Sequence, residues 1–158
     1  MRLTQPTDDH CIELMSWFSS AEELGVWSGP GFGYPFDLIS FRRDIKLDSL
    51  KSFSLISSDQ DLLAFGQYYL RFGRCHLGRL VVNPCLRGQG IVAQLIAQLS
   101  ALGHADLDTD SCSLFVVSDN QSAIRAYLNL GFTRADYPGE LPLDNCFYMV
   151  KESINARC

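Results

Sequence analysis

The stretch from Leu80 to Ala97 constrains the fold of this chain more than any other part of the sequence. Leu80–Val82 is apolar, as expected of a buried strand, and Asn83-Pro84 interrupts it. From Gly90 onward, apolar residues recur at the spacing of one helix face, namely Ile91, Leu95, Ile96 and Leu99. The sequence therefore predicts a strand that leads through a loop into a helix.

The loop itself, Arg87-Gly88-Gln89-Gly90, predicts an anion site. The start of a helix exposes backbone N–H groups that have no intrahelical partner, together with the positive end of the helix dipole. Phosphates are the anions most often bound there. Glycine at positions 88 and 90 removes the Cβ atoms that would hold a phosphate away from those amides.

Two kinds of phosphate loop fit this outline. Gly88-x-Gly90-x-x-Ala93 satisfies the dinucleotide fingerprint of nucleotide-dependent oxidoreductases. In that fold, however, the first glycine follows its strand directly and the unit opens a doubly wound domain. Here Asn83–Arg87 stands between strand and glycine, and the residues after Ala93 are too few for the remaining strands. The dinucleotide interpretation is therefore the weaker alternative.

Two motifs together resemble the Gcn5-related N-acetyltransferases. Arg87–Val92 resembles their acyl-CoA loop, whose pattern is (Q/R)-x-x-G-x-(G/A), and it follows a family-like Val82-Asn83-Pro84. The second half of the family signature is matched by Asn120–Tyr127 and then Leu130-Gly131-Phe132. The chain departs from the pattern at Val92, where the family has Gly or Ala.

The resemblance covers residues 53 to 151 and implies an α+β fold. The expected sheet is mixed and mostly antiparallel, with about seven strands and about four helices, in one N-acetyltransferase domain over residues 1–158. The strand before the loop and a strand over Ser113–Val117 should run parallel and splay apart.

The activity implied by the resemblance is transfer of an acetyl group from acetyl-CoA to a primary amine of a small molecule or a protein N-terminus. The amine would attack the thioester directly in a ternary complex. The pyrophosphate would lie on the loop amides and the pantetheine along the preceding strand. The cofactor residues so implied are Leu80, Val81, Val82, Arg87, Gly88, Gln89, Gly90, Ile91, Val92, Ala93, Asn120 and Tyr127. The alternative is a non-catalytic acyl-CoA-binding or sensor domain of the same fold.

Two residues are catalytic candidates. Tyr127 falls on the family's tyrosine position, where a protonated phenol can give its proton to the departing thiolate. The alternative is a packing residue, since Ile124, Tyr127 and Leu128 share a helix face. His76 stands where histone-type members carry a glutamate base and has a suitable ordinary pKa. A half-buried histidine bonded to a neighbour is at least as common.

Trp27, Phe32 and Tyr34 belong to a loop rich in Gly, Pro and aromatic residues. Aromatic side chains are numerous there for a mere connection. One interpretation is that they fold back onto the core. The other is that they form a wall of the acceptor pocket, which is the role of this region in the resembled family.

The remaining elements are predicted from capping and breaking residues. Thr7 or Asp8 should begin a helix that breaks at Gly25, and Asp37 should begin a second one. Gly66 marks a bulge in the strand Leu62–Phe72. The helix after the loop should cover residues 90–102 and end at Gly103.

Composition excludes several classes of function. The formal net charge is −5 without a cluster of Lys or Arg, so nucleic-acid binding is not expected, and a cationic amine substrate is modestly favoured. No apolar run approaches the length of a membrane helix, and the N-terminus lacks a signal-peptide core, so we expect a cytoplasmic protein. The six cysteines show no metal-ligand spacing, and no metal is predicted. Dimers are common in the resembled family, so a homodimer fits the resemblance.

Overall fold

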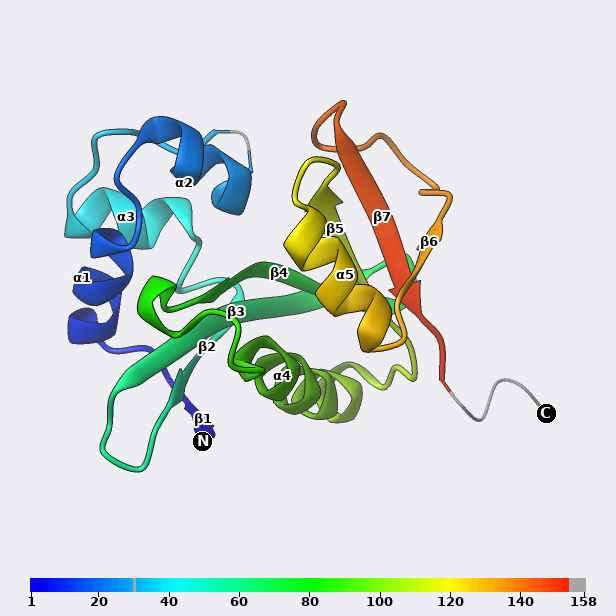
Figure 1. Ribbon diagram of the computed structural model, residues 1–158, viewed down its shortest axis with the longest axis horizontal. Helices are drawn as coiled ribbons and strands as arrows, with labels where there is room; N and C mark the ends of the chain where they lie inside the picture. The colour runs from blue at the N-terminus through cyan, green and yellow to red at the C-terminus, as the bar shows by residue number, and fades with distance from the viewer. Residues whose placement is uncertain (30, 154–158) are drawn as a thin grey trace.

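The computed structural model describes residues 1–29 and 31–153, and in that part of the chain one seven-stranded sheet organises the fold (Figure 1). The strand order is β1-β2-β3-β4-β5-β7-β6, and only the pair β4–β5 is parallel. The predicted mixed, mostly antiparallel sheet is therefore confirmed. The strands are β1 (Arg2–Thr4), β2 (Lys51–Ile56), β3 (Leu62–Arg71), β4 (Arg74–Val82), β5 (Cys112–Val117), β6 (Thr133–Ala135) and β7 (Cys146–Lys151).

Five α-helices accompany the sheet in the described residues, close to the number expected. They are α1 (Asp8–Ser16), α2 (Ala21–Ser28), α3 (Leu38–Asp44), α4 (Ile91–Leu107) and α5 (Gln121–Asn129). Helices α1 to α3 lie on one face of the sheet and α4 crosses the other, while α5 lies beside β5 (Figure 1). Pro84–Leu86 forms a short 3-10 turn before α4. None of the helices in the described residues combines the length and apolarity that a membrane span requires.

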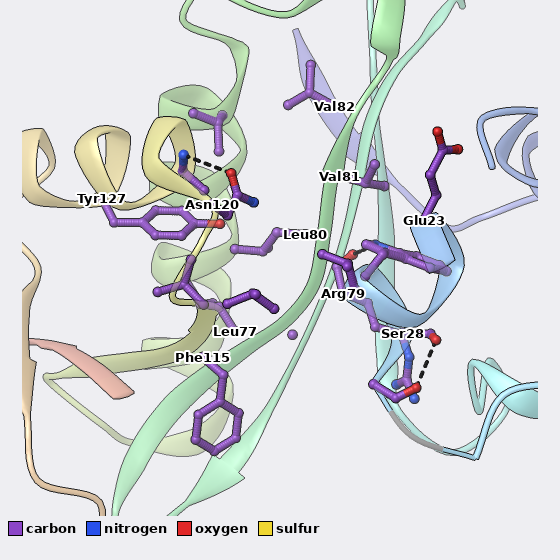
Figure 2. Close-up of a pocket in the computed structure, with 18 of the residues that line it drawn as sticks. Glu23, Ser28, Leu77, Arg79, Leu80, Val81, Val82, Phe115, Asn120 and Tyr127 are labelled. Atoms are coloured by element: carbon purple, nitrogen blue, oxygen red, sulfur yellow. Dashed lines mark hydrogen bonds between the residues drawn. The ribbon is translucent and has the colours of Figure 1, made fainter. Parts of the chain in front are cut away.

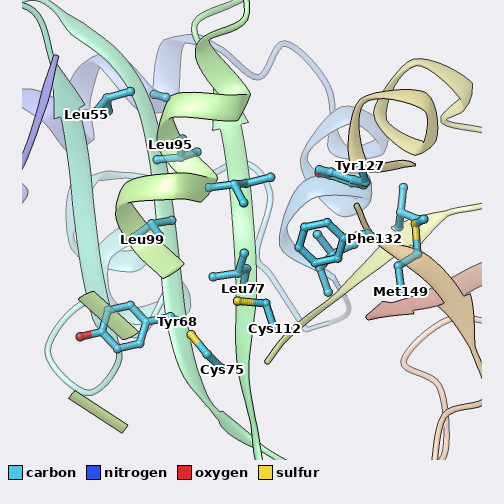
Figure 3. Packing of buried hydrophobic residues seen from close by; sticks show 14 of the residues in the cluster. Leu55, Tyr68, Cys75, Leu77, Leu95, Leu99, Cys112, Tyr127, Phe132 and Met149 are labelled. Atoms are coloured by element: carbon cyan, nitrogen blue, oxygen red, sulfur yellow. The ribbon is translucent and has the colours of Figure 1, made fainter. Parts of the chain in front are cut away.

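The core has one cluster on each face of the sheet. On the first face, Cys11 and Leu14 of α1 and Phe41 of α3 pack against Phe65 and Val81. On the opposite face, α4 packs against β2, β3, β4 and β5, and the cluster extends to α5 and Phe132 (Figure 3). Figure 3 shows the Leu95, Leu99, Leu77, Cys75, Cys112 and Tyr127 side chains of this second cluster.

The N-terminal helices begin as predicted but divide differently. Thr7 caps α1 and Asp37 caps α3, each through a reciprocal capping box. The predicted break at Gly25 is wrong, because α1 already ends at Ser16 and Gly25 lies inside α2. Ser20 begins α2 by accepting a hydrogen bond from the backbone N–H of Glu23. Serine hydroxyls satisfy free helix-end amides well, so a new helix starts there.

The helix after the loop is longer than predicted. Gly103 does not end α4, which continues to Leu107 and closes at Asp108 in the left-handed conformation. A Cβ atom at position 103 would overlap the Sγ atom of Cys75. This glycine therefore serves the close approach of α4 to β4 and not the termination of the helix.

The predicted irregularity at Gly66 exists, but the extra residue is on β4. Gln67 pairs with Gly78, while Phe65 pairs with Val81, so Arg79 and Leu80 together stand opposite Gly66. Arg79 has a positive φ of 47°. Gly66 provides space for a neighbour, because a Cβ there would lie 2.9 Å from Cδ2 of Leu80. The bulge bends β4 at the point where it leaves β5.

The parallel pair β4–β5 is short. Its ladder covers only Cys75–Leu77 on β4 and Cys112–Leu114 on β5. Beyond it, β5 stays paired with β7 through Val117, whereas β4 turns away with β3. The predicted separation of these strands is confirmed, and it opens the sheet between its two halves (Figure 1).

Candidate functional site

A cleft of about 1320 Å³ lies where β4 and β5 separate, and it extends to both sides of β4 (Figure 2). The first half is formed by the start of α4, by α5 and by the splayed strands. The second half is formed by α2 and by the face of the sheet opposite α4. Figure 2 shows Leu80 directed toward Tyr127 and Asn120, and Arg79 and Val81 on the side of α2.

The loop before α4 forms one end of the first half. Gly88 and Gly90 have φ angles of 78° and 76°, which favour glycine. A Cβ atom at either position would meet nothing within 4 Å, so the space above the loop is open. Arg87, Ile91 and Val92 line the cleft with the two glycines. The predicted phosphate residues Gln89 and Ala93 are not among the lining residues.

The start of α4 differs from the other helix starts in the described residues. Helices α1, α2, α3 and α5 each receive a side-chain cap, from Thr7, Ser20, Asp37 and Asn120. Gly90 gives α4 no such cap, and the first turn of α4 carries no acidic residue. The amides of that turn are therefore available to an anion, in the field of a 17-residue helix.

The bulged strand forms the middle of the cleft. Leu80, Val81 and Val82 all line it. Neither Arg79 nor Leu80 has a ladder partner on β3 or β5. The indole Nε1–H of Trp27 donates to the backbone carbonyl of Arg79 at 2.8 Å, so α2 holds the bulge in place.

Asn120 and Tyr127 come from α5 and face the same half of the cleft (Figure 2). The Asn120 side chain caps α5 by accepting from the backbone N–H of Ala123 at 3.3 Å. Tyr127 is 8% exposed, and its ring packs against Phe132 with 6.1 Å between centroids. Burial raises the pKa of Tyr127 to about 12, so its phenol remains protonated at neutral pH.

His76 lies on β4 and is among the residues that line the cleft, but it is only 1% exposed. Its Nδ1 atom is 2.8 Å from Oγ of Ser113, and its ring packs between Tyr69 and Phe115. Burial, with a smaller contribution from the positive charge of Arg71, lowers the pKa of His76 to about 3. A neutral imidazole with so low a pKa is a weak acceptor for an ammonium proton. Its environment is that of the buried, hydrogen-bonded histidine considered as the alternative.

The three predicted pocket residues separate in the structure. Trp27 is among the residues that line the cleft, whereas Phe32 and Tyr34 are not. Phe32 packs onto Phe41 with 5.5 Å between ring centroids. The hydroxyl of Tyr34 donates to the carbonyl of Ser19 at 3.2 Å. Phe32 and Tyr34 thus hold the segment between α2 and α3 against the helices on this face of the sheet, where aromatic rings bury apolar surface.

Several lining residues of the second half were not identified from the sequence. They are Glu22 and Glu23 on α2, Tyr69 and Arg71 on β3, and Phe115 on β5. One available signal was the alternation Gln67-x-Tyr69-x-Arg71, which places polar groups on a single face of a long strand.

The sequence profile of the Acetyltransferase (GNAT) family matches residues 12–132. The chain belongs to this GNAT family. The predicted resemblance is thereby confirmed. Departure from the loop pattern at Val92 does not change the assignment, since the match spans both motifs and most of the chain.

Solved GNAT structures share the fold at low identity. The PaiA N-acetyltransferase from Thermoplasma acidophilum, in complex with coenzyme A, has a TM-score of 0.66 at 17% identity, covering 96% of this chain and 98% of that one. A mutant of the spermidine N-acetyltransferase from Vibrio cholerae has a TM-score of 0.70 at 14% identity, covering 96% and 95%. The ribosomal-protein-S18-alanine N-acetyltransferase from Escherichia coli has a TM-score of 0.65 at 17% identity, covering 97% and 94%. The predicted GNAT fold is confirmed.

Proposed function

We propose that this GNAT chain is an acetyl-CoA-dependent N-acetyltransferase that acetylates a primary amine of a small molecule or of a protein N-terminus. The observation that carries the proposal is the uncapped start of α4, which opens onto a cleft continuous with the bulged part of β4. The family match supports it, as does the likeness to a relative solved with coenzyme A and to relatives named for spermidine and a ribosomal protein.

The donor would be bound in the first half of the cleft. Its diphosphate would accept hydrogen bonds from the first-turn amides of α4, with Gly88 and Gly90 permitting close approach. Arg87 is exposed beside them and would add a positive charge. The pantetheine arm would follow Leu80–Val82, where the departure of β5 leaves one edge of β4 free.

The transfer would proceed by direct attack of the amine nitrogen on the thioester carbonyl carbon. A C–N bond forms, and the carbonyl oxygen becomes an oxyanion. A backbone N–H of Leu80 or Val81 would stabilise that charge, and such donors are commonly worth about 3 kcal/mol. The C–S bond then breaks, and the Tyr127 hydroxyl would donate its proton to the leaving thiolate. The attacking nitrogen loses its proton to water in the cleft.

His76 would take no part in proton transfer, because burial keeps its imidazole neutral and its Nδ1 atom is hydrogen-bonded to Ser113. The acceptor would instead react through its neutral fraction. A lysine-type primary amine has a pKa of about 10.4 and an α-amino group one of about 7.7–8.0, so at pH values below the pKa the neutral fraction rises about tenfold for each unit by which the pH is raised.

The decisive experiment measures both binding and turnover. Purified protein is titrated calorimetrically with acetyl-CoA and then incubated with acetyl-CoA and a panel of primary amines while free thiol is recorded. Binding with amine-dependent thiol release is the expected result. Binding without release by any amine would favour the non-catalytic acyl-CoA module, and NAD binding without acetyl-CoA binding would favour the oxidoreductase alternative.

A further inference from the structure

Two guanidinium groups in the second half of the cleft have no carboxylate partner in the described residues 1–29 and 31–153. Arg71 is on β3 and Arg79 is in the bulge of β4, and both line the cleft. The ion pairs that this part of the chain forms involve Arg42, Arg43 and Arg74 instead. Half-buried cations without a counter-charge are uncommon unless something else supplies that charge.

The fold brings these two side chains to the same surface. Residues Gln67, Tyr69 and Arg71 alternate along β3 and therefore share one face. The bulge turns Arg79 onto that face as well, where its Nη1 donates to Oε1 of Gln67 at 2.9 Å. Its neighbour Gly78 has no side chain to compete for the space.

Tyr69 lies within the electrostatic reach of both guanidinium groups. Burial raises the pKa of the Tyr69 phenol, and the charges of Arg71 and Arg79 act in the opposite direction. The Arg71 guanidinium is 5.1 Å from the centroid of the Tyr69 ring and 5.5 Å from that of Phe115. Two positive charges thus converge around one aromatic wall of the cleft.

Both arginines retain unused donors. Arg79 donates from Nη1 to Gln67 and from Nη2 to the backbone carbonyl of Asp44 at 3.5 Å, whereas its Nε is buried without a partner. Arg71 donates from Nη1 to the Tyr137 hydroxyl at 3.2 Å. A guanidinium carries five N–H donors in a planar fork that matches carboxylate and phosphate oxygens.

Asp44 and Glu23 are hydrogen-bonded to groups other than Arg71 and Arg79. Burial lowers the pKa of Arg79, and the negative charge of Asp44 opposes this shift by favouring the charged form of the guanidinium. The carboxylate oxygens of Asp44, however, accept hydrogen bonds from Nε of Arg43 and from the backbone N–H of Gly33, both at 3.1 Å. Glu23, on the opposite wall, accepts from the backbone and hydroxyl of Ser19. Glu22 is exposed on α2, and Lys46 adds a further positive charge to the lining.

We propose that the acceptor carries an oxyanion group, a carboxylate or a phosphate, in addition to its amine, and that Arg71 and Arg79 bind this group. The proposal rests on the proposed acetyltransferase function and narrows its substrate class. An anchored oxyanion would direct the amine toward the bulge at Leu80 and Val81, where the thioester would lie. Although the chain is acidic as a whole, this wall of the cleft selects against purely cationic amines such as polyamines.

The test compares amines that differ only in the anionic group. Amino acids are paired with their decarboxylated amines, phosphoethanolamine with ethanolamine, and spermidine is included. Thiol release from acetyl-CoA gives kcat and KM for each. The expected result is that kcat/KM is at least about tenfold higher for one anionic class than for the matching amines that lack the anionic group. The class that is preferred distinguishes a carboxylate from a phosphate.

Variants then assign the effect to the two side chains. Arg71→Gln and Arg79→Gln should raise the acceptor KM about tenfold or more for anionic amines, without changing KM for acetyl-CoA. Arg71→Lys and Arg79→Lys keep the positive charge, so the acceptor KM should rise less in them than in the Gln variants. Arg134→Gln is the matched control, because Arg134 also lies over an aromatic ring, Phe147, but outside the cleft lining.

Binding provides a readout that does not depend on turnover. The CoA-bound protein is titrated with N-acetyl amino acids as free acids and as amides, and with N-acetylphosphoethanolamine. Tighter binding of the anionic forms, lost in Arg79→Gln, supports the inference. The inference is overturned if compounds with and without the anionic group are turned over or bound equally, or if spermidine is preferred. Either result would leave the acetyltransferase proposal intact. Absence of acetyl-CoA binding would instead contradict the proposed function itself.

Discussion

Tyr127 and His76 are both buried ring side chains, and burial moves their pKa values in opposite directions. Low polarity disfavours the charged form of either group. It raises the pKa of the Tyr127 phenol to about 12 and lowers that of the His76 imidazole to about 3. The tyrosine therefore keeps a proton that it can donate, whereas the histidine stays neutral.

Replacing Tyr127 by Phe removes the proposed proton donor and little else, because the ring contact with Phe132 is kept. We expect kcat to fall about 100-fold while KM for acetyl-CoA is unchanged. Steady-state kinetics with thiol detection measures both constants. Tyr148→Phe is the control, since it removes a buried hydroxyl outside the cleft lining. An unchanged kcat in Tyr127→Phe would exclude the acid role.

His76 should make the free energy of unfolding fall at acid pH, and it should not affect the pH dependence of catalysis. Its folded-state pKa of about 3 lies below the unfolded value of about 6.5, so only the unfolded state gains a proton as the pH falls through that interval. The resulting loss of unfolding free energy is about 2 kcal/mol between pH 7 and pH 5. Urea unfolding at both pH values should show this loss in the wild type and a smaller one in His76→Gln.

The pH dependence of kcat/KM gives the second readout for His76→Gln. If the acceptor reacts through its neutral fraction, log kcat/KM rises with a slope of about one up to the amine pKa, in the variant as in the wild type. A profile that loses a step between pH 6 and pH 7 in the variant would restore His76 as the general base.

Helix α4 has two roles, one at its start and one along its body. Its uncapped start supplies the proposed phosphate site, and its body anchors β3 and β4 from behind the cleft. Gly90 serves the first purpose through its positive φ, and Gly103 the second through the absence of a Cβ.

Gly90→Asp places a carboxylate where the diphosphate is proposed to bind. We expect acetyl-CoA affinity, measured by calorimetry, to fall on the order of 100-fold. Gly90→Asn is the matched neutral variant, because Asn tolerates left-handed backbone and has nearly the same shape. Gly73→Asp introduces the same charge at a φ of 76° in the β3–β4 turn. Equal affinities in all three variants would contradict the loop assignment.

Gly103→Ala should destabilise the protein by about 1–3 kcal/mol, because the new methyl group must displace Cys75 or tilt α4. The free energy of urea unfolding measures the change. Gly25→Ala is the helix-interior control, where a Cβ meets nothing within 4 Å and should stabilise by about 0.5–1 kcal/mol. Similar values for the two variants would show that α4 does not pack as described.

At the scale of the whole molecule, the cleft depends on parts that are distant in sequence. It brings together α2, the bulge of β4, the start of α4 and the α5 helix. The Trp27–Arg79 hydrogen bond alone joins residues 52 positions apart. Such a cleft forms only in the folded chain, so a ligand that fills it must stabilise the folded state.

Acetyl-CoA should therefore raise the melting temperature of the protein. At a free concentration 100 times its Kd, the stabilisation is about 2.7 kcal/mol. Differential scanning fluorimetry with acetyl-CoA and with NAD compares the two candidate nucleotides directly. A shift with NAD and none with acetyl-CoA would contradict the proposed cofactor.

The sequence was sufficient for several features that depend on neighbours along the chain. Gly88 and Gly90 could be recognised because left-handed backbone and close anion approach both favour glycine. Asn120 could be recognised as a helix cap, because capping acts within three residues. The strand–loop–helix order around Leu80–Ala97 follows from local periodicity in the same way.

Tertiary packing decided what depends on distant contacts. Gly103 resembles a helix end locally, but the approach of Cys75 determines its role. His76 has an ordinary sequence context, and only burial beside Ser113 removes its basicity. Arg71 and Arg79 meet because a bulge shifts β4 by one residue against β3, a register that no local pattern specifies. The sequence alone therefore determined where the glycine loop before α4 lies, and the folded sheet determined which residues face it.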